Sequence, residues 1–114
     1  MNPKALERLI YNESRGNPAV GIDKSNYSAG IGQVSRAVWR KYTDLPYIDS
    51  ADPKYYETNM RVAAKYLKEN YNYFGNYKEA LMAYNMGKSA LIQAKHGLRN
   101  IPKVTQAYVS NFKE

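Results

Sequence analysis

Glu13 is the acidic residue whose position in the sequence best suits proton transfer. It continues the face of a predicted helix on which apolar residues recur at helical spacing, at Leu6, Leu9 and Ile10. Gly16 suits the left-handed position after a helix and Asn17-Pro18 prevents continuation, so Glu13 is expected in the last turn. Burial and the negative end of the helix dipole would both raise its pKa, as a general acid near neutral pH requires. The alternative is a solvated carboxylate at a frayed helix end.

Other polar residues that could take part in chemistry follow this helix. Residues 17–31 are rich in Gly, Ser, Asn and Asp, which in a compact domain is more often a functional loop than a filler. Asp23 in this loop is a possible second carboxylate, which could activate water if it lay across a cleft from Glu13. His96, the one histidine, is expected to cap a helix end near Gly97. Because the chain has no cysteine and no histidine cluster, a metal site is not expected. No cofactor is expected either.

Length and composition are those of one globular domain, which we expect to span residues 1–114. Hydrophobic residues make up 44% and charged residues 24%, so disorder of the whole chain is not expected. The net charge of +7 favours an anionic partner, such as nucleic acid or an anionic cell wall. Twelve tyrosines suit stacking on bases or on sugar rings. No apolar run approaches the ~18 residues that span a membrane.

The elements that must position these residues are helices. The helices are predicted from residue 3 to about 15, from a cap at Ser35 through Trp39, from Asp52-Pro53 to just before Gly75, from a cap at Asn76 to Gly87, from Ser89 to about His96, and after Pro102. Glu79 completes a capping box with Asn76, and Trp39 is expected as a core anchor. The apolar face of the longest helix is predicted as Tyr56, Met60, Ala63, Ala64, Leu67 and Tyr71. The sequence therefore predicts a mainly α fold of five or six helices, with at most a small hairpin within residues 19–32.

Five segments carry recognisable motifs: Glu13–Pro18 (similar to E-S-x-x-N-P), Ser28–Val34 (S-x-G-L-M-Q-[IV]), Asn59–Leu67 (N-[IL]-x-x-[GA]-x-x-Y-L), Phe74–Gly87 (F-G…A-L-x-A-Y-N-x-G) and, more weakly, Ile101–Val109 (I-P…Y-V). In this order they resemble the motifs of the soluble lytic transglycosylases, a lysozyme-like family with goose-type lysozymes as more distant relatives. A single motif could arise by chance, whereas four in family order at compatible spacings identify the chain as a member. The resemblance covers nearly the whole chain.

The resemblance implies a lysozyme-like α+β fold around a substrate cleft, in an enzyme that acts on peptidoglycan. The bond cut would be the β-1,4 linkage between N-acetylmuramic acid and N-acetylglucosamine. In that family one Glu makes both proton transfers, so Glu13 would first protonate the leaving oxygen and then act as base toward the muramic 6-hydroxyl. The product is a 1,6-anhydro sugar, and neither a second carboxylate nor a cofactor is required. The residues implied to contact the substrate are Ser28, Gly30, Ile31, Gly32, Gln33, Tyr84 and Asn85.

Two departures from the family pattern limit what is carried over. Gly32 stands where the family usually has Met, so one wall of the site is expected to be more open or to have a different backbone conformation. The closing segment has Val104-Thr105-Gln106 in place of the usual Glu-Thr pair, so no role of that Glu is transferred. Structural alternatives also stay open: loop capping for Ser28, a buried bridge to the Glu13 helix for Gln33, and a core position for the Tyr84 ring.

Three further functions are weighed against a lytic transglycosylase. A hydrolysing lysozyme would use Glu13 with Asp23, and a wall-binding module would have no catalytic role. A nucleic-acid-binding domain is disfavoured because no basic recognition helix is present. The expected partner is therefore peptidoglycan, with no nucleic acid or membrane and with a monomer as the default. The chain starts without an export segment, so the expected settings at the cell wall are a phage particle, release at lysis, or a domain of a longer exported enzyme.

Overall fold

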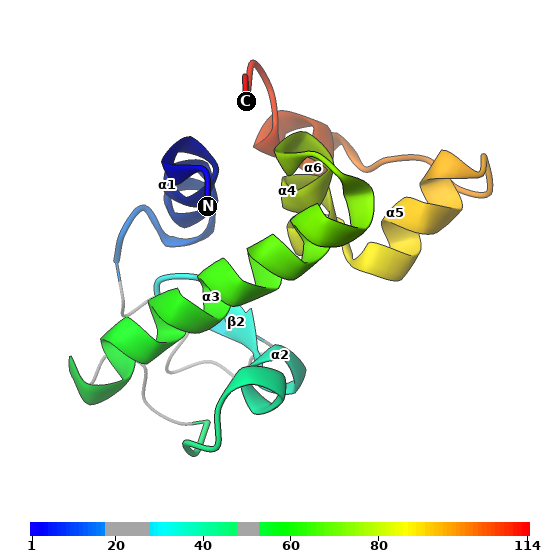
Figure 1. Ribbon diagram of the computed structural model, residues 1–114. Helices are drawn as coiled ribbons and strands as arrows, with labels where there is room; N and C mark the ends of the chain where they lie inside the picture. Colours follow the sequence, from blue (N-terminus) through cyan, green and yellow to red (C-terminus); the bar gives the residue numbers. More distant parts are fainter. Residues whose placement is uncertain (18–27, 48–52) are drawn as a thin grey trace. The chain divides into compact units, whose positions relative to one another are not determined.

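The computed structural model describes residues 1–17, 28–47 and 53–114 (Figure 1). Within them the chain forms six helices and one two-stranded sheet: α1 Pro3–Ser14, β1 Ser28–Ala29, β2 Val34–Ser35, α2 Arg36–Tyr42, α3 Pro53–Phe74, α4 Tyr77–Met86, α5 Lys88–Lys95 and α6 Lys103–Tyr108. The prediction of a mainly α fold with a small hairpin is confirmed. The contacts divide the chain into two compact units, one of Leu6–Tyr66 and one of Met1–Ala5 with Leu67–Glu114. A single domain over residues 1–114 stays a prediction.

The hairpin of the Leu6–Tyr66 unit pairs β1 with β2 in antiparallel register, Ala29 opposite Val34. Gly30 (φ 84°) and Gln33 (φ 47°) both have left-handed backbone conformations, and the Gln33 N–H donates to the Gly30 carbonyl at 3.0 Å. These residues reverse the chain, and β2 follows the turn. The expectation of a hairpin confined to residues 19–32 was therefore wrong at its second strand, which lies beyond residue 32.

The helix after the hairpin begins as predicted. Ser35 is the N-cap of α2, and its Oγ accepts a hydrogen bond from the Val38 N–H at 3.2 Å. Trp39 is 2% exposed, and its indole Nε1–H donates to the Leu45 carbonyl at 2.6 Å. The Tyr47 ring packs edge-on against it at 5.8 Å between centroids. Trp39 is thus confirmed as a core anchor, and it holds the segment after α2 against that helix.

The longest helix, α3, begins at Pro53 and ends at Phe74, next to Gly75 with φ 85°. Its buried residues are Tyr55, Asn59, Val62, Ala63, Leu67 and Asn70. Ala63 and Leu67 were predicted on this face, whereas Tyr56, Met60, Ala64 and Tyr71 are only half-buried. The predicted face was therefore wrong by about one residue. The pattern of apolar residues excluded Asn59, but its side chain is buried because two hydrogen bonds satisfy it, as described below.

Helices α4 and α5 belong to the unit of Met1–Ala5 and Leu67–Glu114. Asn76 caps α4: its Oδ1 accepts from the Glu79 N–H and its Nδ2 donates to the Glu79 Oε1, both at 2.8 Å. Gly87, with φ 97°, separates α4 from α5, and His96 is the C-cap of α5. The predicted caps at Asn76 and His96 are both confirmed. The buried residues of α4 include Ala80, Leu81 and Ala83.

Candidate active site

Glu13 lies in the last turn of α1, as predicted, and is half-buried. The helix ends at Ser14, and the next two residues, Arg15 (φ 56°) and Gly16 (φ 81°), both have left-handed backbone conformations. The expectation for Gly16 is confirmed, and Arg15 adopts the same conformation one residue earlier. The chain therefore turns sharply just after Glu13. The proton-transfer role and the raised pKa of Glu13 stay predictions.

Ser14 connects this helix end to the turn of the hairpin. Its Oγ–H donates to the Ile31 carbonyl at 2.6 Å, and its Oγ accepts from the Gly16 N–H at 3.1 Å. Ser14 is 4% exposed, and its bond to the Ile31 carbonyl is shielded from water, whereas the bond from the Gly16 N–H is only partly buried. The residue directly after Glu13 thus fixes the end of α1 against the turn.

Asn59 of α3 holds the same turn from a second helix. Its Oδ1 accepts from the Gly32 N–H at 2.9 Å, and its Nδ2 donates to the Ala29 carbonyl at 3.0 Å. At 1% exposed, it is among the most buried residues of the chain. Because its amide satisfies one donor and one acceptor of the turn, it selects one backbone conformation.

The segment predicted to contact substrate is this turn, and it is mostly buried. Gly30, Ile31 and Gly32 are buried, whereas Ser28 and Gln33 are half-buried. The Gln33 Nε2 donates to the Gly30 carbonyl at 2.9 Å, within the turn. Ser14 makes one bridge between the Glu13 helix and this turn, and the bridge considered for Gln33 stays a prediction. The Gly32 N–H donates to the Asn59 Oδ1. Contact of these residues with substrate stays a prediction.

Tyr47 supports the strand that follows the turn. Its hydroxyl donates to the Val34 carbonyl at 2.7 Å. Burial raises the pKa of Tyr47, opposed by the nearby positive charge of Arg36. The hydroxyl therefore keeps the proton that it donates, and β2 is held at a fixed place after the turn.

A model of the transglycosylase SLT domain matches residues 1–104. The chain belongs to the transglycosylase SLT domain family. Neither a comparison with curated proteins nor one with solved structures gives a match. Membership supports a function of the peptidoglycan lytic transglycosylase kind, with peptidoglycan as substrate and the cell wall as the place of action. The family resemblance inferred from the motifs is thereby confirmed.

In this SLT domain, Tyr84 and Asn85 lie in α4, in a different compact unit from Glu13. Both are half-buried. The Asn85 Oδ1 accepts a hydrogen bond from the Thr105 Oγ1 at 2.6 Å, and Thr105 of α6 is fully buried. Thr105 comes from the closing segment that departs from the family pattern, and here it fixes the Asn85 amide. The predicted roles of Tyr84 and Asn85 toward the substrate stay predictions, and Asp23 lies outside the described residues.

Three positioning residues were given no role from the sequence: Ser14, Asn59 and Thr105. The first two stand inside the motifs that identified the family, and all three are polar and less than 5% exposed. A polar residue among buried apolar positions on a helix could have indicated them, because such a group must find a hydrogen-bond partner.

Two further surveys concern the described part of the chain. No helix there is both long and apolar enough to cross a membrane. Within residues 1–17, 28–47 and 53–114, no three side chains of His, Cys, Asp or Glu gather where they could hold a metal ion.

Proposed function

We propose that this SLT domain cuts the β-1,4 bond between N-acetylmuramic acid and N-acetylglucosamine, with Glu13 as the proton-transferring residue. The observation that carries the proposal is the hydrogen bond from the Ser14 Oγ–H to the Ile31 carbonyl, which links the last turn of α1 to the 30–33 turn. A general acid must be held at one position relative to the bond that it protonates. Ser14 and Asn59 supply such rigidity from two helices.

In the proposed reaction Glu13 starts protonated. Its proton passes to the glycosidic oxygen as the bond from that oxygen to the muramic C1 breaks, and the glucosamine end leaves as an alcohol. The resulting carboxylate then takes the proton of the muramic 6-hydroxyl, whose oxygen bonds to C1. The products are a 1,6-anhydro end and a regenerated acid, so no water is consumed.

The test is digestion of purified peptidoglycan, with the released muropeptides weighed by mass spectrometry. We expect products lighter by one water than their hydrolysed counterparts. Glu13→Gln should reduce the rate by about 10²–10⁴-fold while the circular dichroism spectrum stays unchanged, because the amide cannot donate a carboxyl proton. Glu7→Gln is the matched control, since Glu7 lies exposed on the same helix. It should keep the wild-type rate.

Other outcomes would contradict parts of the proposal. Reducing ends in place of anhydro ends would mean that water attacks C1, and Asp23→Asn would then test the second carboxylate. Full activity of Glu13→Gln would remove Glu13 from the chemistry. Absence of products from folded wild-type protein would favour a wall-binding module.

A further inference from the structure

The connection between α5 and α6 borders a cavity of about 690 Å³, large enough for part of a peptide. It belongs to the compact unit that includes Leu67–Glu114. Its lining combines two cations, two amide side chains and a short apolar wall: Arg99, Lys103, Asn100, Gln106, Ala94, Ile101 and Pro102.

The backbone around this cavity is fixed on both sides. After α5 the Gly97 N–H donates to the Ala94 carbonyl at 3.0 Å and the Leu98 N–H to the Gln93 carbonyl at 2.9 Å, with Gly97 at φ 76°. This pair of bonds is the Schellman arrangement, which ends a helix in one defined turn. On the α6 side, the Gln106 Nε2 donates to the carbonyl of residue 101 at 2.9 Å. The cations are therefore presented from a defined backbone.

No carboxylate of the described residues pairs with the two cations of this cavity. Arg99 and Lys103 are both exposed. The sequence has no Asp or Glu anywhere in residues 80–113, which hold the cations Lys88, Lys95, Arg99, Lys103 and Lys113. Two free cations at a concave surface concentrate positive potential and attract an anion.

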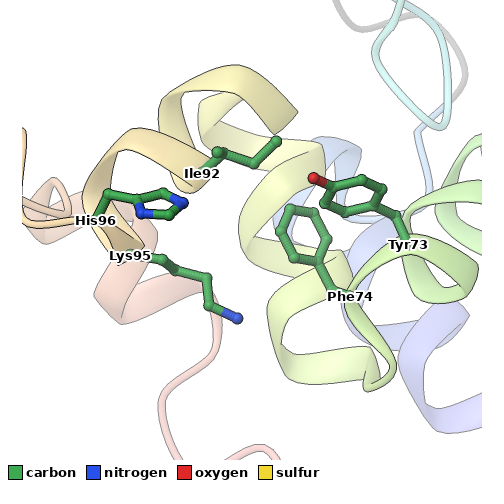
Figure 2. A pocket seen from close by; sticks show the side chains of 5 residues that line it. All are labelled: Tyr73, Phe74, Ile92, Lys95 and His96. Carbon is green, nitrogen blue, oxygen red and sulfur yellow. The ribbon is translucent and has the colours of Figure 1, made fainter.

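A second cavity on α5, of about 280 Å³, differs because its cation is paired with a carboxylate. It is lined by Tyr73 and Phe74 at the end of α3 and by Ile92, Lys95 and His96 (Figure 2). The Lys95 Nζ lies 2.7 Å from a carboxylate oxygen of Glu79 in α4. The cation of this cavity is therefore already engaged within the chain, in contrast to the pair at the α5–α6 connection.

We propose that the cavity of Arg99 and Lys103 binds the carboxylates of a peptidoglycan stem peptide; this inference rests on the proposed function. The sugars of a peptide-bearing strand are uncharged, because the lactyl carboxyl of muramic acid is amide-linked to the peptide. The free carboxylates are therefore on the peptide. The guanidinium of Arg99 matches a carboxylate with two parallel hydrogen bonds, and Lys103 adds a second charge. The apolar wall suits small aliphatic side chains such as that of alanine.

The experiment compares two substrates and two double variants. The substrates are glycan strands with their stem peptides and the same strands stripped of peptides by an amidase. Arg99→Gln with Lys103→Gln removes both cations of the cavity. Lys78→Gln with Lys113→Gln removes the same charge from exposed positions that do not line it.

We expect KM of the cavity variant to be about tenfold higher on peptide-bearing strands, because the charge-assisted hydrogen bonds to a carboxylate are lost. kcat should stay unchanged, and on stripped strands KM should change less than twofold. The control variant should change KM less than twofold on both substrates. Equal effects on the two substrates, or equal effects of the two variants, would overturn the inference in favour of general electrostatic attraction.

A binding measurement separates this inference from the proposed function. The stem peptide released by the amidase is titrated into wild-type protein and into the cavity variant, while the backbone N–H signals of Asn100 and Ile101, which line the cavity in both, are followed by NMR. We expect a saturable shift that the cavity variant lacks. A shift with duplex DNA or a polyol phosphate, but none with the peptide, would overturn the inference. If the wild type cut neither substrate, the proposed function would fail, and the titration would still decide the role of the cavity.

Discussion

At the scale of single residues, Ser14 shows how one small side chain joins two segments. Its hydroxyl donates a buried hydrogen bond to the Ile31 carbonyl and accepts a partly buried one from the Gly16 N–H. We expect Ser14→Ala to lower the free energy of unfolding by about 1–3 kcal/mol, because a buried carbonyl loses its donor. Urea denaturation measures this, and kcat should fall with it because the turn is no longer fixed to the end of α1.

The control for Ser14 is Ser89→Ala, which truncates an exposed serine of α5. It should change the stability by no more than about 0.5 kcal/mol. Equal stability of the two alanine variants would mean that the Ser14 bonds do not hold the turn.

Asn59 allows a sharper test, because it both accepts and donates. Asn59→Asp keeps the shape and the acceptor for the Gly32 N–H, but it places a carboxylate oxygen against the Ala29 carbonyl. We expect a loss of about 3 kcal/mol at pH 7, since a buried charge meets another acceptor. The loss should shrink in acid, because a protonated carboxyl regains an O–H donor.

The matched control for this change is Asn72→Asp, near the other end of the same helix. Asn72 is exposed, so its variant should lose no more than about 1 kcal/mol, chiefly because a new negative charge meets the negative end of the helix dipole. A loss from Asn59→Asp that did not depend on pH would argue against the donor role of the Asn59 amide.

At the scale of elements, the first turn of α4 is held by charge as well as by its cap. Burial acts to raise the pKa of Glu79, but hydrogen bonds from Lys95 and Asn76 and the charge of Lys95 outweigh it. The pKa is thus lowered from 4.5. Because the unfolded chain then binds more protons in acid, Glu79 stabilises the fold above pH 4.5, and this contribution is lost as the pH falls through the folded pKa.

We therefore expect Glu79→Gln to flatten the fall in unfolding free energy between about pH 5 and pH 3, measured by urea denaturation at each pH. Lys95→Met should flatten it in the same sense, because it removes the charge that lowers the pKa. Lys78 lies next to Glu79 on α4 but is not among the groups that lower the Glu79 pKa, so Lys78→Met should keep the wild-type slope. A wild-type slope in Glu79→Gln would contradict the role of this carboxylate.

At the scale of the whole molecule, residues from both ends of the sequence meet at Tyr77. The Asn2 N–H donates to its hydroxyl at 3.2 Å, and its own N–H donates to the carboxylate of Glu114. Its ring stacks on Tyr71 at 4.1 Å between centroids. The first residues of the chain and the last thereby belong to the unit that contains α4.

We expect Glu114→Ala to lower the stability by about 1 kcal/mol, since it removes a charged acceptor from the first turn of α4. Hydrogen exchange at the Tyr77 N–H should become faster. Glu57→Ala removes a carboxylate whose ion pair with Arg61 is exposed, and it should cost less than about 0.5 kcal/mol. Equal losses in the two variants would show that the contact between Glu114 and Tyr77 does not stabilise the unit.

The sequence by itself determined the family and the order of the helices. Caps and breakers such as Ser35, Asn76 and Gly87 act on neighbours within four residues, so their effect can be predicted without knowing the fold. The last-turn position of Glu13 followed from the same kind of signal. The proposed chemistry was inferred from the motif that contains Glu13, because members of a family share residue types at the same spacings.

Only the tertiary structure decided which polar residues hold the 30–33 turn and the Asn85 amide, and where the second strand lies. Ser14 and Ile31 are 17 residues apart, Asn59 and Gly32 are 27 apart, and Thr105 and Asn85 are 20 apart. The sequence alone does not distinguish an Asn that becomes buried from an Asn that stays in water. The buried face of α3 was therefore predicted from apolar residues only, and it was displaced by about one residue. The physical reason is that a polar group is stable inside a protein only with its partner, and the partner is chosen by the fold.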